Sequence, residues 1–375
     1  MDNSRPTWAE IDLTAIEHNL SSIRRAAGPA RIMAVVKANA YGHGVEEVSR
    51  VCQEWGVDYF GVASLEEAME LRQAGITAPV LTLGYLPEAS AATAVAADVT
   101  PCIFTMDAAL AFSQAAQAAG KKARVHIKID TGMGRLGFKV QEESLDLVEK
   151  IAGLPGIELE GIITHFAEAD GESETFTRRQ LDLFSGFIRE LESRGHHIPI
   201  KHCANSAAIF RYPEAIFDMV RAGIVLYGLA PSPAMKAELD IIPAMTLKSQ
   251  VSYVKKLPPG YPVSYGRRYY CREEAIVATV PIGYADGYNR LLSNRSWGMV
   301  KGHSVPLIGT VCMDQCMFDV TGVEEVRTGD EIILFGKPEE GITADDLAAL
   351  IGTINYEIVC SLGVRVPRFY KRSQV

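Results

Sequence analysis

Short apolar runs alternate with helix-like segments over the first 240 residues of the chain. Eight of these runs have the length and β-branched content of buried strands. They are Ile32–Val36, Tyr59–Val62, Val80–Leu83, Cys102–Phe104, Val125–Ile129, Leu159–Thr164, Ile198–Cys203 and Met219–Tyr227. Most neighbouring runs are separated by residues with helical periodicity, such as 65–72 before Gly75 and 180–194 before Gly195.

Eight strand-then-helix units within about 200 residues are typical of a (β/α)8 TIM-type barrel. A doubly wound open sheet is the alternative, but it usually has fewer units. No G-x-G-x-x-G sequence follows the first run, as a dinucleotide-binding sheet would favour. The pattern therefore predicts an α/β fold built on a barrel.

The pattern changes after Pro231-Ser232-Pro233, where short β-like runs are separated by turn signals. One helix is predicted at 343–351, with Thr343 as its N-cap. We expect two domains: residues 1–240 form the barrel, and residues 241–375 form a smaller, mostly β domain.

Composition narrows the class of protein. The net charge of −9 comes without a Lys/Arg stripe, which argues against nucleic acid as a partner. No secretory signal pattern opens the chain, and no run approaches the roughly 20 apolar residues of a membrane span. Seven scattered cysteines without a C-x-x-C pair suit reduced thiols, so a cytoplasmic protein without a metal site is expected.

Polar residues gather where the predicted strands end, which is where barrel enzymes place their chemistry. Lys37 directly follows an apolar run; its amine could form a Schiff base, or its side chain could simply extend to the barrel rim. Ser206 and Gly223-Ile224 follow the seventh and eighth runs, where barrels commonly bind phosphate. A lysine combined with a phosphate site suggests a pyridoxal phosphate enzyme.

The stretch Ala34–Gly44 (AVVKANAYGHG) resembles the cofactor-attachment segment of the bacterial alanine racemases. The similarity continues nearly to the end of the chain. Further matching blocks are 128–138, 161–166, 217–232, 263–266, 281–287, 311–315, 353–357 and 365–368.

The resemblance implies pyridoxal 5'-phosphate as cofactor, alanine as substrate and a homodimer that supplies D-alanine for peptidoglycan. It implies that Lys37 carries the cofactor and that Tyr265 of the partner subunit is the second base. The remaining implied catalytic and cofactor-binding residues are His165, Arg221, Tyr41, His202, Asn205, Ser206, Gly223, Ile224 and Tyr356. Arg135 and Met313 are implied to bind the substrate carboxylate, with Lys128 positioning the arginine, and Asp170, Tyr284 and Arg290 are implied to line the entrance.

The expected chemistry explains this arrangement. Racemisation removes the α-proton from one face and returns a proton to the other, so two bases must flank the substrate, here Lys37 and Tyr265. Arg221 would leave the cofactor's ring nitrogen neutral, because an arginine does not give up its proton. His165 is the candidate hydrogen-bond partner that eases ionisation of the tyrosine.

The chain departs from the family at Thr310, where many relatives carry an arginine in the entrance. We therefore expect Asp170 and Arg290 to pair directly. Three alternatives remain: a serine or broad-specificity racemase, an amino-acid decarboxylase on the same barrel, and a single-domain cofactor-binding protein. Arg221 argues against the decarboxylase, and the C-terminal domain argues against the last.

Overall fold

The computed structural model describes residues 5–373, which form two compact units. One unit contains residues 17–40 and 45–241. The other contains residues 5–16, 41–44 and 242–373. The expected boundary near residue 240 places the first residues with the barrel; in the structure they group with the C-terminal residues instead.

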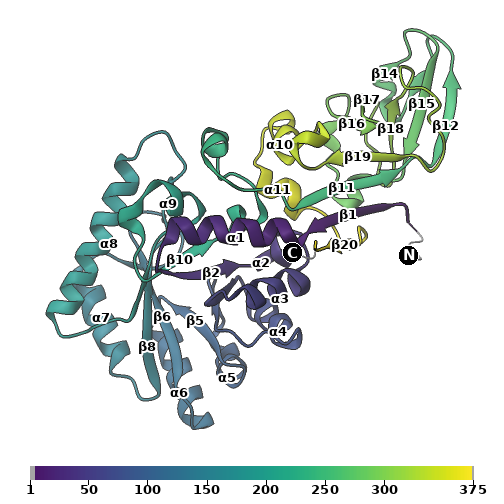
Figure 1. The fold of residues 1–375 in the computed structure, drawn as a ribbon. Helices are drawn as coiled ribbons and strands as arrows, with labels where there is room; N and C mark the ends of the chain where they lie inside the picture. Colours follow the sequence, from purple (N-terminus) through teal and green to yellow (C-terminus); the bar gives the residue numbers. More distant parts are fainter. Residues whose placement is uncertain (1–4, 374–375) are drawn as a thin grey trace. The chain divides into compact units, whose positions relative to one another are not determined.

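The first unit is a barrel of eight parallel strands, with a short ninth strand, β7 (Phe138–Lys139), paired to β6 (Figure 1). The eight strands are β2 (Arg31–Val35), β3 (Tyr59–Val62), β4 (Val80–Thr82), β5 (Val99–Ile103), β6 (Ala123–Asp130), β8 (Ile157–Ile163), β9 (Ile200–His202) and β10 (Met219–Ala222). β10 pairs with β2, and hydrogen bonds from Asp218 N to Lys201 O (3.1 Å) and from Arg221 N to Ala204 O (3.0 Å) join the β10 segment to the β9 segment. The predicted barrel is confirmed.

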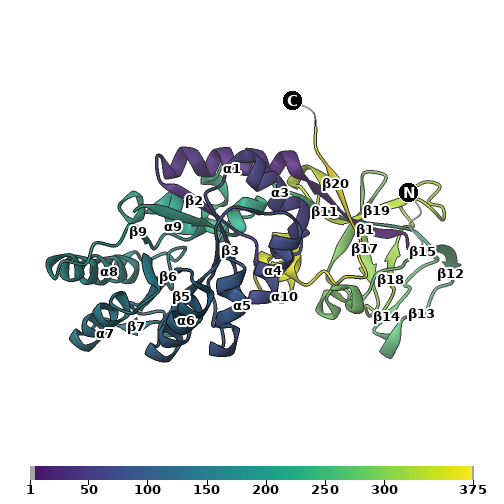
Figure 2. The same cartoon turned by 90° about the horizontal axis from the view of Figure 1, so that it is seen from below.

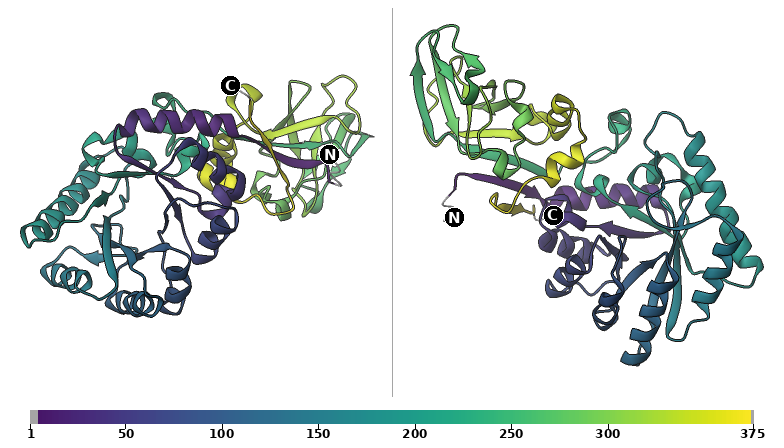
Figure 3. Two further views of the ribbon diagram at one scale, coloured as in Figure 1. Left: turned by 60° about the horizontal axis from the view of Figure 1, so that its bottom comes forward. Right: turned by 180° about the vertical axis from the view of Figure 1, so that it is seen from behind.

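Helices cover the outside of this barrel (Figures 2 and 3). They are α3 (Val45–Trp55), α4 (Leu65–Gln73), α5 (Ala91–Ala96), α6 (Met106–Ala119), α7 (Glu142–Ala152), α8 (Thr175–Ser193) and α9 (Ser206–Arg211), and α1 (Leu13–Ala27) precedes β2. Because helices lie on one face and side chains fill the other, strands such as β3 are buried at every position, which explains their continuous apolar sequence.

The eighth predicted strand is wrong beyond Ala222. The chain leaves the extended conformation at Gly223 (φ −100°, ψ −110°), and Ile224–Tyr227 form a 3-10 helix that ends at Gly228 in the left-handed region. All four helix residues are buried. Their apolar character therefore reflects burial, which periodicity alone cannot distinguish from a buried strand.

The second unit contains a nine-stranded sheet of order β12-β15-β18-β17-β16-β19-β11-β1-β20. Its strands are β1 (Thr7–Asp12), β11 (Met245–Gln250), β12 (Tyr253–Leu257), β15 (Ala275–Val280), β16 (Trp297–Val300), β17 (His303–Ile308), β18 (Cys316–Asp319), β19 (Glu331–Phe335) and β20 (Arg368–Lys371), with a hairpin of β13 (Pro262–Val263) and β14 (Tyr269–Tyr270). Strand β1 pairs antiparallel with β11 and parallel with β20. The mostly β C-terminal domain is confirmed.

Two helices accompany this sheet, α10 (Ala344–Ile351) and α11 (Asn355–Cys360). Thr343 is the N-cap of α10, as predicted, and its hydroxyl accepts a hydrogen bond from Asp346 N at 3.2 Å. Across residues 5–373, no helix combines the length and apolar content that would carry it through a membrane.

Candidate active site

Lys37 lies at the carboxyl end of β2 and begins a turn of unusual handedness, labelled α2 (Lys37–Tyr41). The four residues after the lysine have φ between 52° and 53°. None is glycine, and each left-handed residue costs about 1–2 kcal/mol. Strain of this kind persists only where the surroundings enforce it and is concentrated at functional sites.

Glu67 of α4 enforces the start of this turn. Its carboxylate accepts hydrogen bonds from Ala38 N (2.8 Å) and from Ala63 N (2.7 Å) at the end of the neighbouring strand β3. Asn39 adds a second constraint, because its side-chain oxygen accepts from Val45 N at 2.8 Å. The backbone that carries Lys37 is thus held by side chains on both of its sides.

The end of the turn requires a glycine at 42. Gly42 has φ +81°, and a Cβ there would lie 2.1 Å from the Val359 carbonyl oxygen. Its own carbonyl accepts from Arg368 Nε at 3.0 Å. His43 follows Gly42, and its Nδ1 forms a hydrogen bond with the Tyr41 carbonyl at 2.9 Å. This contact indicates that His43 stabilises the turn and is not a catalytic residue.

We predict that Glu67→Ala lowers kcat about tenfold, by analogy with the hydrogen-bond partners that orient metal ligands, whose loss typically costs about 10- to 100-fold in activity. An alanine at position 67 leaves the N–H groups of Ala38 and Ala63 without their acceptor and releases the turn, so Lys37 loses its orientation. KM should change little, and the cofactor that the family resemblance assigns to Lys37 should attach more slowly in a stopped-flow absorbance assay.

Glu66→Gln is the matched control, since Glu66 is exposed in the same first turn of α4. It removes one negative charge from the helix start without touching Ala38. Equal rates of cofactor attachment in the two variants would contradict a positioning role for Glu67.

Four basic side chains act on His165 at the carboxyl end of the barrel. Burial, followed by the charges of Arg221, Lys128, Arg135 and Lys37, holds the pKa of His165 well below its ordinary value. Predicted site residues from strand ends β2, β6, β8 and β10 are therefore brought together. Such a concentration of positive charge in a barrel mouth suits an anionic ligand.

Arg221 is buried at the centre of this group and is hydrogen-bonded on both terminal nitrogens. One, NH1, donates to His202 O (3.1 Å) and to His202 Nδ1 (3.3 Å). The other, NH2, donates to Thr164 O, Cys203 O and His165 Nδ1 at 2.9–3.0 Å. Within the described chain, these acceptors leave Nε as the guanidinium donor that can serve a ligand.

These bonds also fix where His165 carries its proton. A guanidinium can only donate, so His165 Nδ1 accepts and the proton of the neutral ring lies on Nε2. His165 therefore offers an N–H donor on the side away from Arg221. That is what the sequence argument requires of a group that eases ionisation of a tyrosine.

Ser206 and Gly223 meet at the loops after β9 and β10. Gly223 N donates to Ser206 Oγ at 3.0 Å, and both residues, like Ile224, are buried. Asn205 has a structural task as well, since its side-chain oxygen caps α9 by accepting from Ala208 N at 3.1 Å. Asp170 lies in the same unit, where its carbonyl accepts from Ser232 Oγ.

Tyr265 belongs to the other unit, where the residue is 71% exposed. Its backbone is held by Thr310, a buried residue whose hydroxyl donates to the Tyr265 carbonyl at 2.9 Å. Ser264 Oγ in turn donates to the Thr310 carbonyl at 2.6 Å. Sequence reasoning placed Thr310 in the entrance and missed this contact, for which a lone threonine gives no signal.

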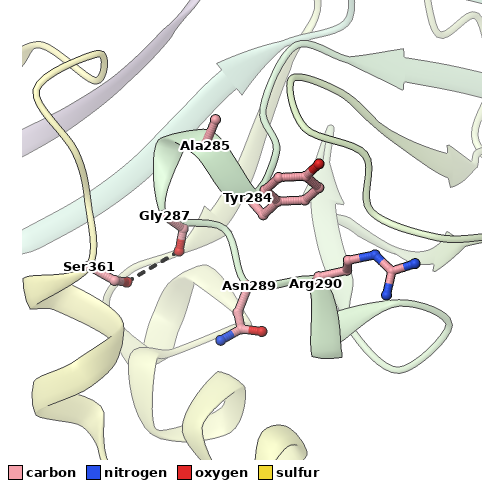
Figure 4. A pocket seen from close by; sticks show the side chains of 6 residues that line it. All are labelled: Tyr284, Ala285, Gly287, Asn289, Arg290 and Ser361. Carbon is pink, nitrogen blue, oxygen red and sulfur yellow. Dashed lines mark hydrogen bonds between the residues drawn. The ribbon is translucent and has the colours of Figure 1, made fainter.

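The remaining predicted residues of this unit form two groups. Tyr284 and Arg290 line one pocket (Figure 4). Met313 lies close to Tyr284: the Met313 carbonyl accepts a hydrogen bond at 3.0 Å from the backbone N–H of Ala285, the residue after Tyr284. Tyr41 and Tyr356 form a tilted ring pair with centroids 6.1 Å apart.

Known proteins match this chain over nearly its whole length. The family "Alanine racemase, N-terminal domain" matches residues 11–231, and "Alanine racemase, C-terminal domain" matches residues 244–370. An alanine racemase of Methanococcus maripaludis is 47% identical, covering 98% of this chain and 99% of the relative. One from Clostridium perfringens is 48% identical over 98% of this chain and 96% of the relative.

The fold agrees as well. The solved alanine racemase of Clostridium difficile 630 superposes with a TM-score of 0.94 at 41% identity, covering 99% of this chain and 97% of that chain. Both units therefore have counterparts in the same solved proteins.

Proposed function

The chain belongs to the alanine racemase family and interconverts L- and D-alanine; we propose that it does so on pyridoxal phosphate, with Lys37 and Tyr265 as its two bases. The observation that carries the proposal is the position of Lys37. It lies at the start of an enforced left-handed turn at the mouth of a barrel, among the basic side chains around His165.

The described residues fit this cofactor. Pyridoxal phosphate presents an aldehyde, a pyridine nitrogen and a phosphate, and each has a suitable group in the barrel unit. Lys37 supplies the amine, Arg221 supplies Nε–H to the ring nitrogen, and the loops at Ser206, Gly223 and Ile224 supply donors for the phosphate. His202 and Asn205 hold these groups in place, while Tyr41 and Tyr356 are proposed to complete the phosphate site.

The cofactor, when bound, supplies a system that can accept the electrons left on the α-carbon. The chain moves the proton. Lys37 Nζ takes the α-proton from one face, and the Tyr265 hydroxyl returns a proton to the opposite face. The reverse reaction exchanges their tasks. His165 donates through Nε2–H to the tyrosine oxygen and so stabilises its ionised form.

Substrate recognition is assigned to Arg135 and to the backbone of Met313, which would bind the carboxylate of alanine. Lys128 lies beside the arginines and is proposed to position Arg135. Asp170, Tyr284 and Arg290 are proposed to line the entrance. A serine or broad-specificity racemase is the alternative that this arrangement leaves, and the substrate test below distinguishes it.

As membership of the family implies, we propose a homodimer in which each site takes its tyrosine from the partner subunit. Mixing Lys37→Ala with Tyr265→Phe tests this arrangement. A hybrid dimer regains one intact site, so activity should recover to about a quarter of the wild-type value after subunit exchange. Mixtures as inactive as their parents would contradict a shared site.

Lys128 is predicted to carry a carbamate formed from carbon dioxide, as its counterpart does in some family members. Burial and the nearby charge of Arg221 lower its pKa from 10.5 to about 7. Carbamate formation needs the neutral amine, so it should be extensive above pH 7 and be lost as the pH falls below it. A carbon-13 NMR signal from labelled bicarbonate, absent in Lys128→Ala, would verify it.

The function is tested by absorbance and by optical rotation. The purified protein should absorb near 420 nm, roughly where a lysine-bound cofactor does. It should abolish the optical rotation of L-alanine faster than that of L-serine. Preference for serine would retain the mechanism and change the substrate, whereas no absorbance band and no turnover would reject the proposal. A role in supplying D-alanine for peptidoglycan in the cytoplasm follows as part of the proposal.

A further inference from the structure

A line of buried polar side chains runs through the barrel from Arg221 towards the amino-terminal ends of the strands. His202 Nδ1 contacts Arg221 NH1 at 3.3 Å, and His202 Nε2 contacts His126 Nδ1 at 2.8 Å. His126 Nε2 contacts Glu160 Oε2 at 3.1 Å. Both histidines are fully buried, whereas 13% of the Glu160 side chain is exposed.

The two ends of this line dictate the same hydrogen-bond order. Arg221 only donates, so His202 Nδ1 accepts, His202 Nε2–H donates, and His126 Nδ1 accepts. That leaves the proton of His126 on Nε2, facing a carboxylate that only accepts. A proton added to either ring would set two donors against each other, and burial independently lowers the pKa of both histidines.

The backbone makes room for the line. A Cβ at Gly161 would lie 2.4 Å from the His126 ring, so the ring occupies space that only glycine leaves. The pairing of β6 with β8 shifts register between Val125 and His126, an irregularity of the kind that redirects side chains beside active sites. The glycine and the register shift together allow the His126 ring to pack directly against β8.

Charged and titratable neighbours keep Glu160 an acceptor. Arg124 NH1 lies 3.6 Å from Glu160 Oε1, and Tyr59 is a further neighbour that lowers the pKa of the same carboxylate. His126 is the remaining partner. Together they hold the pKa of Glu160 below its ordinary value despite the opposing effect of burial.

We propose that Glu160 is a positioning residue for Arg221, acting through His126 and His202 from the end of the barrel opposite the cofactor. The carboxylate fixes the tautomers of both histidines, and His202 then holds Arg221 with Nε directed to its ligand. The effect on catalysis rests on the proposed function; the hydrogen-bond order does not.

The order is tested by nitrogen-15 NMR of the purified full-length protein labelled at its eight histidines. His126 and His202, assigned with single-site variants, should both be neutral and protonated on Nε2 at neutral pH. A proton on Nδ1, or a charged ring, at either residue would overturn the proposal whether or not the protein proves to be a racemase.

The effect on Arg221 is tested by three variants. Glu160→Leu removes the acceptor and should mix the tautomers of His126 and His202, lowering kcat about tenfold with KM for alanine unchanged. Glu160→Gln keeps an acceptor oxygen and should retain both the tautomers and nearly the whole kcat. Glu158→Gln, an exposed position on the same strand, is the control for loss of charge.

Equal losses in the leucine and glutamine variants would show that charge, not hydrogen-bond order, matters, and would overturn the proposal. So would a leucine variant with the tautomers and kcat of the control. If the leucine variant does not fold, Gly161→Ala displaces the His126 ring from the other side and should reproduce the fall in kcat. A Gly161→Ala variant with wild-type kcat would then contradict the positioning role of Glu160.

Discussion

Tyr265→Phe is expected to stop proton removal from one enantiomer of alanine while leaving removal from the other within about tenfold. Loss of a positioned acid or base typically costs about 100- to 10,000-fold, and here only one face of the substrate loses its base. In the proposed mechanism, Lys37 still serves the opposite face. Exchange of the α-proton with deuterated solvent, followed by proton NMR for each enantiomer separately, measures both rates.

The matched control is Tyr270→Phe, because Tyr270 is an exposed tyrosine on the β14 strand next to the same turn. It should leave both exchange rates unchanged. Phenylalanine at 265 keeps the backbone bond from Thr310 to the carbonyl, so the turn itself is undisturbed. Equal losses with both enantiomers would argue against two bases on opposite faces.

Much of the barrel was predictable because its strands are continuous apolar runs between helices with marked periodicity. The same regularity indicated the candidate site. Lys37, His165 and Ser206 each follow the end of a strand, and a barrel brings those ends together whatever lies between them. Local sequence was therefore sufficient wherever position along a strand determined position in space.

The supports of the site were not predictable, because they join residues that are distant in sequence. Nothing near Glu67 indicates that its carboxylate receives the backbone of Ala38, and the left-handed turn contains no glycine to reveal it. His126 has the appearance of one polar residue within an apolar strand. Its role becomes visible only when Glu160 and His202 lie on either side of it.

The first strand was missed for a related reason. Residues 7–12 alternate between buried and partly buried positions, as an antiparallel partner requires, but the pattern does not say which sheet they join. Pairing with β11 and β20 is decided by contacts more than 230 positions away. A boundary drawn from changes in local pattern cannot include such a strand.

Arg221→Glu is expected to lower racemisation and to raise both long-wavelength absorbance during turnover and transamination of the substrate. Burial lowers the pKa of Arg221 to about 10, so the guanidinium stays charged at neutral pH and, in the proposed site, does not protonate the cofactor's ring nitrogen. A glutamic acid can share a proton with that nitrogen, which deepens the electron sink and prolongs the deprotonated substrate. Pyruvate formation measures the side reaction.

Arg221→Lys is the control, since it keeps the positive charge but has fewer donors for His202, His165 and the carbonyls of Thr164 and Cys203. It should lower racemisation without adding pyruvate, which separates lost positioning from altered electronics. Both variants should also have a lower melting temperature than the wild type, because each leaves buried acceptors without a donor. If the glutamate variant racemises normally with an unchanged spectrum, the neutral ring nitrogen is not what keeps this reaction to racemisation.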